Sequence, residues 1–74
     1  MDLARNPYCP VGILDKFIKD ENPRIRLIAA QNANVSLSSL IWFINHETPE
    51  SVFVMLLAGE KIPEVIVDLA YEKF

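Results

Sequence analysis

The sequence is poor in the residues that usually carry chemistry: it has one cysteine, Cys9, one histidine, His46, and two glycines, Gly12 and Gly59. A single cysteine excludes an internal disulfide framework and a cysteine-rich metal site, and it suits a reducing compartment. Two separated glycines exclude a glycine-rich phosphate loop. The longest apolar run, Val52 to Ala58, is far shorter than the roughly 18 to 20 residues of a membrane-spanning helix. The N-terminus also lacks a signal segment, so we expect a cytoplasmic protein without membrane contact.

The few candidate catalytic residues are isolated from one another. No nucleophile lies at an identifiable spacing from His46, so we expect an imidazole that faces solvent at the end of a helix. We expect Cys9 to be an unreactive thiol. Glu60, Glu64 and Asp68 recur every four residues, which is typical of a solvated helix face. The sequence therefore predicts no enzymatic activity, no metal site and no cofactor.

The charge is unevenly distributed. The formal net charge is −3, which argues against nucleic acid as the partner, because phosphate binding draws on clustered lysine and arginine. The first 26 residues hold five of the seven basic residues, namely Arg5, Lys16, Lys19, Arg24 and Arg26. One end of the chain is therefore mixed in charge, and the other is apolar and acidic.

The strongest signal in the sequence is an internal repeat. When the sequence is aligned with itself at an offset of 26 residues, six pairs of identical residues result: Ala4/Ala30, Asn6/Asn32, Leu14/Leu40, Phe17/Phe43, Ile18/Ile44 and Pro23/Pro49. A third copy follows at an offset of 27, with Ser51 as the extra residue, and pairs Ile25, Ile28 and Ser36 with Val52, Met55 and Pro63. Such self-similarity marks an architecture in which each unit buries its apolar face on the next.

Each unit is predicted to contain two short helices. Pro10, Ser36 and Pro63 occupy equivalent positions at which a first helix should begin, because serine caps free amides and proline has none to satisfy. Pro23 and Pro49 should open a second, shorter helix. In the first unit, the apolar residues are spaced by three and four positions, as on one face of a helix: Ile13, Leu14, Phe17 and Ile18.

The first unit carries a family resemblance. It begins with Ala4-Arg5-Asn6-Pro7-Tyr8-Cys9-Pro10, continues through Leu14, Phe17, Asp20 and Pro23, and closes with Ile25, Arg26, Ile28 and Ala29. This resembles the leucine-rich repeat variant, a short bacterial repeat with an Ala-x-Asn-Pro-x-x-Pro start and a Val-Arg-x-x-Val-Ala close. The resemblance implies an all-α, right-handed solenoid of alternating α- and 3₁₀-helices, here one domain over residues 1–74 with about three two-helix units.

Two departures from the pattern favour a second interpretation. Ala33 and Ser36 replace the two prolines in the second unit, and Gly59 stands at the asparagine position of the third. Ordinary α-helices packed as HEAT-like hairpins are therefore an alternative to the 3₁₀ geometry. Some family members hold an iron-sulfur cluster in a separate cysteine-rich segment. Because Cys9 is the only cysteine here, the resemblance does not imply such a cluster in this chain.

Comparison of the units also suggests a binding site. Asp15 and Lys16 become Ile41 and Trp42 in the second unit and Asp68 and Leu69 in the third, and Arg26 becomes Phe53. One explanation is that the central unit is covered on both sides and needs more apolar residues. The alternative is an exposed patch that binds a partner, formed by Ile41, Trp42, Phe53 and Leu69.

These observations predict a non-catalytic, protein-binding helical-repeat module. Homodimerisation is one form of this hypothesis, with Leu69, Tyr71 and Phe74 as the stacking surface. The alternative function is a HEAT-like nucleic-acid module that uses the five basic residues of the first unit.

Overall fold

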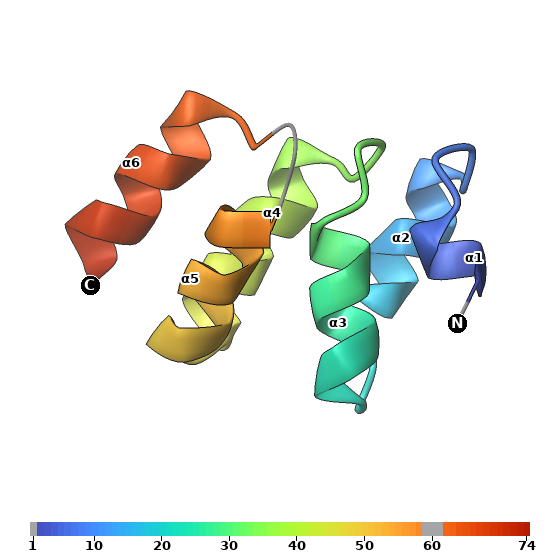
Figure 1. Ribbon diagram of the computed structural model, residues 1–74, viewed down its shortest axis with the longest axis horizontal. Coiled ribbons are helices and arrows are strands. Elements are labelled where there is room, and N and C mark those ends of the chain that lie inside the picture. Colours follow the sequence, from blue (N-terminus) through green and yellow to red (C-terminus); the bar gives the residue numbers. More distant parts are fainter. Residues whose placement is uncertain (1, 59–61) are drawn as a thin grey trace.

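The fold is entirely helical over the part of the chain that the computed structural model describes, residues 2–58 and 62–74 (Figure 1). The described residues contain no strand. The helices are α1 (Asp2–Arg5), α2 (Val11–Phe17), α3 (Pro23–Ala30), α4 (Leu37–His46), α5 (Pro49–Ala58) and α6 (Glu64–Lys73). The predicted all-α class is thus confirmed.

The helices begin where the proline and serine positions predict. Pro10, Ser36 and Pro63 are the N-cap residues of α2, α4 and α6. The Ser36 hydroxyl accepts a hydrogen bond from the Ser39 amide at 3.1 Å, and this satisfies one of the free amides of the first turn. Pro23 and Pro49 are the first residues of α3 and α5. Proline is tolerated there because the first turn has no acceptor for its missing N–H.

The expectation of 3₁₀-helices in alternate positions is wrong for this chain. The second helices of the two units, α3 and α5, are α-helices of 8 and 10 residues. Runs of that length disfavour 3₁₀ geometry, because its tighter hydrogen bonds are poorer and its side chains eclipse every third residue.

The six described helices can be compared with the predicted two-helix units. Two complete pairs are present, α2 with α3 and α4 with α5. In the described part of the third unit only the first helix, α6, is seen, and the departure at Gly59 lies outside the described residues. The short α1 aligns, at the offset of 26, with the end of α3.

The helices contact one another in the order of the repeats. The central helix α3 contacts α1, α2, α4 and α5, while α6 contacts α4 and α5. Figure 1 shows the resulting succession from α1 near the N-terminus to α6 at the opposite end. The molecule measures 31 × 23 × 19 Å.

One hydrophobic core runs through this succession. Its largest fully buried side chains are Phe43, Leu14, Ile18, Leu40, Met55, Ile66 and Val52. The apolar stripe predicted for the first helix is confirmed, since Leu14 and Ile18 are buried while Ile13 and Phe17 pack partly buried against the core. No described helix has the length and apolar character needed to cross a membrane.

Candidate functional site

The polar contacts between the first two units follow the repeat. The Asp15 carboxylate on α2 accepts hydrogen bonds from the hydroxyls of Ser36, at 3.1 Å, and of Ser39 at the start of α4. In the next unit, Ile41 stands at the position of Asp15, and Pro63 and Ile66 stand at the positions of the two serines. An acid-hydroxyl contact is therefore replaced on both of its sides by apolar residues.

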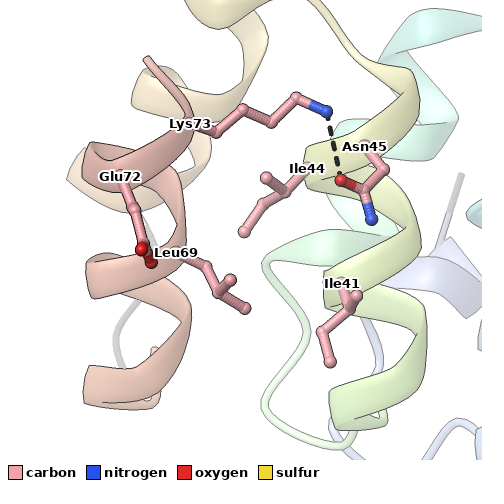
Figure 2. Close-up of a pocket in the computed structure, with 6 residues that line it drawn as sticks. All are labelled: Ile41, Ile44, Asn45, Leu69, Glu72 and Lys73. Atoms are coloured by element: carbon pink, nitrogen blue, oxygen red, sulfur yellow. Dashed lines mark hydrogen bonds between the residues drawn. The ribbon is translucent and has the colours of Figure 1, made fainter.

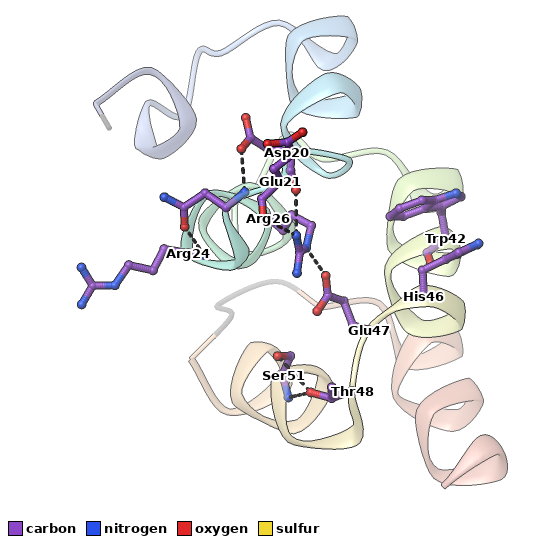
Figure 3. Close-up of polar contacts among 10 residues, drawn as sticks. Asp20, Glu21, Arg24, Arg26, Trp42, His46, Glu47, Thr48 and Ser51 are labelled. Atoms are coloured by element: carbon purple, nitrogen blue, oxygen red, sulfur yellow. Dashed lines mark hydrogen bonds and ion pairs between the residues drawn. The ribbon is translucent and has the colours of Figure 1, made fainter.

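A second pair changes in the same way. The Arg26 guanidinium on α3 pairs with Glu47, and it also donates to the carbonyl oxygens of Asp20 and Glu21 at 2.8 and 3.0 Å (Figure 3). The equivalents of Arg26 and Glu47 are Phe53 and Phe74. These two rings meet edge to face, with centroids 6.2 Å apart. At these two pairs of positions the polar contacts of the first junction are replaced by apolar contacts in the second, where Lys73 also donates a hydrogen bond to Asn45 at 3.1 Å.

Trp42 is half-buried on α4 by contacts within the chain. Its ring stacks on the ring of His46, with centroids 4.1 Å apart and planes 12° from parallel (Figure 3). The Lys19 ammonium from the preceding unit lies 5.5 Å from the Trp42 ring centroid, within cation-π range. Neither of the extreme predictions for this residue, fully buried or fully exposed, describes it.

Substitution of Trp42 should therefore have an intermediate effect. We expect Trp42→Ala to lower the free energy of unfolding by about 1 to 3 kcal/mol, because the ring loses partial burial and two specific contacts. His46→Ala, which removes only the stacked partner, should lower it by less than about 1 kcal/mol. Urea titrations followed by circular dichroism measure both. A loss of about 4 kcal/mol or more for Trp42→Ala would show that the residue belongs to the core.

The four residues predicted as a binding patch do not form one exposed surface. Ile41 is 37% exposed, whereas Trp42, Phe53 and Leu69 are half-buried. Ile41 and Leu69 do lie together, pointing into a pocket between α4 and α6 (Figure 2). Phe53 instead contacts Tyr71 and Phe74, with a centroid distance of 5.7 Å to Tyr71. The apolar replacements at Ile41 and Phe53 are thus explained by packing between the second and third units.

Comparison of burial along the repeat reveals a different surface. Tyr71 on α6 is 67% exposed, whereas its equivalents Ile18 and Ile44 are 0% and 2% exposed. Leu57 on α5 is 88% exposed, whereas its equivalents Ala4 and Ala30 are fully buried. Val54 and Phe74 are also exposed, and we call Val54, Leu57, Tyr71 and Phe74 the C-terminal edge. Leu69, which the sequence placed on this surface, faces α4 instead.

Sequence comparison alone missed Leu57 and Val54. The repeat alignment contained a signal for Leu57, because a large apolar residue occupies a position that alanine holds in the two earlier units. It gave no reason to expect exposure, since a leucine on an apolar helix is usually core. Burial of the equivalent positions supplies that reason.

The opposite end of the molecule also carries an exposed surface. Asn32, which is buried, donates hydrogen bonds from its Nδ2 to the carbonyl oxygens of Ala4 and Asn6, each at 2.8 Å. Its equivalent, Asn6, is exposed, and its Nδ2 has no partner among the described residues. Leu3, Tyr8 and Val11 are exposed beside it. We call Leu3, Asn6, Tyr8 and Val11 the N-terminal edge.

The candidate catalytic residues lie apart. Cys9 is buried, with its thiol 3.7 Å from the Pro10 carbonyl oxygen, to which it donates. His46 is exposed at the end of α4, as expected, and its Nδ1 donates to the Trp42 carbonyl oxygen at 2.9 Å. Of the predicted acidic row, Glu64 and Asp68 are exposed on α6, and Glu60 lies outside the described residues. No group of three or more potential metal ligands occurs among the described residues.

Comparisons with protein-family models, with curated proteins and with solved structures found no match to this chain.

Proposed function

We propose that the protein is a non-catalytic protein-interaction module, a short helical-repeat solenoid of the leucine-rich repeat variant or HEAT-like kind, which associates with further copies of itself. One observation carries the proposal: the C-terminal edge exposes Leu57 and Tyr71 at positions that are buried in both earlier units. In those units, residues of the following unit lie at two of these positions, since Asn32 donates to the Ala4 carbonyl oxygen and Ile44 lines a pocket with Leu69 of α6. A surface of this kind calls for a helical partner with the same repeat geometry.

The N-terminal edge of a second copy fits this requirement. It exposes apolar residues, including Tyr8 at 89%. It also offers the Asn6 amide, whose equivalent Asn32 donates to the Ala4 carbonyl oxygen of the preceding unit. Leu57 is the repeat equivalent of Ala4, so Asn6 of a second copy can donate to the Leu57 carbonyl oxygen in the same register.

Charge favours this head-to-tail arrangement over contact between two C-terminal edges. The helix α6 carries three acidic residues and one lysine, whereas most of the basic residues belong to the first unit. Two copies of α6 brought together would repel each other, while the first unit, whose basic and acidic residues nearly balance, would repel α6 less. Head-to-tail contacts that do not close into a ring also allow growth beyond a dimer.

The association should be weak. Burial of a large apolar side chain contributes about 1.5 to 3 kcal/mol, and association costs an estimated 4 to 15 kcal/mol in lost freedom of motion. The apolar residues of the two edges together can outweigh that cost by a modest margin. We expect dissociation constants in the micromolar range, which corresponds to about −8 kcal/mol at 1 μM.

Substitution of Leu57 tests the proposal. Sedimentation over a dilution series should show concentration-dependent growth of the wild type, and Leu57→Asp should remain monomeric because the substitution places a carboxylate in the apolar contact. The matched control is Val65→Asp on α6, since the equivalents of Val65, Gly12 and Ser38, are exposed in their own units. A wild type that stays monomeric at high micromolar concentration would contradict the proposal, as would a loss of association in the control.

A further inference from the structure

Another surface runs along α3, and it adjoins the two edges through Arg5 and Pro7 beside Asn6 and through Ala58 beside Leu57. Two adjoining hollows of about 490 and 510 Å³ share Arg5 and Ile28, and together form one groove. The first is lined by Arg5, Pro7, Ile28, Gln31, Asn32, Ala33 and Ala58. The second is lined by Arg5, Asn22, Arg24, Ile25, Leu27 and Ile28. An apolar strip on α3 therefore lies between two arginines.

The groove is positively charged in an acidic protein. The chain has ten acidic and seven basic residues, yet none of the described residues that line either hollow is an aspartate or a glutamate. Arg5 and Arg24 are both exposed, and among the side chains of residues 3–58 and 62–74 neither guanidinium has a hydrogen-bond or ion-pair partner. Arg26, on the same helix as Arg24, differs from it, because its guanidinium already forms hydrogen bonds with Glu47 and with two carbonyl oxygens. Two exposed arginines therefore line the groove, where they can bind an external anion.

From this charge pattern we infer that the groove binds an acidic, amphipathic segment of another protein. Guanidinium groups bind carboxylates through paired hydrogen bonds, and Ile25, Leu27 and Ile28 would contact the apolar side chains between those carboxylates. Arg24 and the apolar residues of α3 belong to neither edge, so the inference can be tested in a variant that does not self-associate.

The structure disfavours nucleic acid as the occupant. Of the five basic residues that the sequence offered for such a role, only Arg5 and Arg24 line the groove. Lys19, in the turn after α2, lies over the ring of Trp42 on α4, and Arg26 is paired with Glu47. Sequence-independent binding to nucleic acid draws on several phosphate contacts, and two guanidinium groups supply few of them.

Selection from an unbiased dodecapeptide library tests the inference, with the wild-type chain as the target. The enriched peptides should combine aspartate or glutamate with aliphatic residues. Fluorescence anisotropy of one such labelled peptide should then show binding that weakens about tenfold, or about 1.4 kcal/mol, in Arg24→Glu and in Arg5→Glu. A version of the peptide with glutamine in place of glutamate should lose affinity to a similar extent, and binding should weaken as salt rises.

The matched control is Lys16→Glu, which makes the same charge change at an exposed residue outside the groove. Circular dichroism should show all three variants folded, since each substituted side chain is exposed. The inference is overturned if no peptide is enriched, if the enriched peptides carry no acidic excess, or if Lys16→Glu weakens binding as much as Arg24→Glu. It is also overturned if a labelled oligothymidylate binds more tightly than the peptide and depends on Arg24. Binding by the monomeric Leu57→Asp variant would separate this site from self-association.

Discussion

Phe43→Ala should leave the chain unfolded or close to it. Phe43 has the largest of the fully buried side chains, and it lies on α4, which contacts α3, α5 and α6. Truncation of a buried phenylalanine lowers stability by about 3 to 5 kcal/mol, because the apolar contacts are lost and a cavity remains. A free energy of unfolding of roughly 4 to 11 kcal/mol is expected for 74 residues, and a small domain belongs near the lower end.

The repeat supplies a control for this substitution. Phe17 is the equivalent of Phe43 in the first unit, and it is only partly buried. Phe17→Ala should therefore lower the free energy of unfolding by clearly less than Phe43→Ala, as measured by urea titration of dilute protein. Equal losses for the two variants would mean that the core does not centre on α4.

The second large effect is expected for Asn32→Ala. The Asn32 amide donates to the carbonyl oxygens of Ala4 and Asn6, and its Oδ1 accepts from the Asn34 amide at 2.8 Å. Removal of the side chain leaves the buried Ala4 carbonyl oxygen and the part-buried Asn34 amide without these partners, whereas the Asn6 carbonyl oxygen keeps its hydrogen bond from the Cys9 amide at 3.0 Å. Because an unsatisfied buried polar group costs about 1 to 3 kcal/mol, we expect the free energy of unfolding to fall by about 2 to 4 kcal/mol.

Asn6→Ala is the matched control for Asn32→Ala. The side chain of Asn6 makes only the equivalent turn contact, in which its Oδ1 accepts from the Tyr8 amide at 2.9 Å, and it is exposed. We expect this substitution to lower the stability of the monomer by less than about 1 kcal/mol. Thermal melts of the two variants would decide the matter, and a larger loss for Asn6→Ala would contradict the assigned roles.

The sequence was sufficient to predict the helix class and the starts of the main helices. Those starts depend on local chemistry, since Pro10, Ser36 and Pro63 act within one turn of themselves. The helix type of α3 and α5 was harder to predict, because the choice between α and 3₁₀ geometry depends on packing as well as on the proline positions.

The candidate site was predicted less well, because the exposure of a side chain depends on the residue that packs against it as well as on the side chain itself. Ile41 and Phe53 look like exposed apolar residues when each is compared with its equivalent in the first unit. Their partner positions change with them, from serine to Ile66 and from Glu47 to Phe74. A comparison of single positions cannot separate a binding patch from an apolar junction, whereas a comparison of pairs can.

The central claim is that the C-terminal edge of one copy binds the N-terminal edge of another, and mixing two variants tests it most directly. Leu57→Asp damages only the C-terminal edge, and Tyr8→Asp damages only the N-terminal edge. Both side chains are almost fully exposed, so both variants should fold.

Sedimentation of each variant alone should show a monomer, because every head-to-tail contact needs one intact edge of each kind. An equimolar mixture should form a one-to-one dimer that does not grow further, since only one intact pair of edges is then available. If Tyr8→Asp alone still associates, or if the mixture remains monomeric at concentrations where the wild type assembles, the head-to-tail account is wrong.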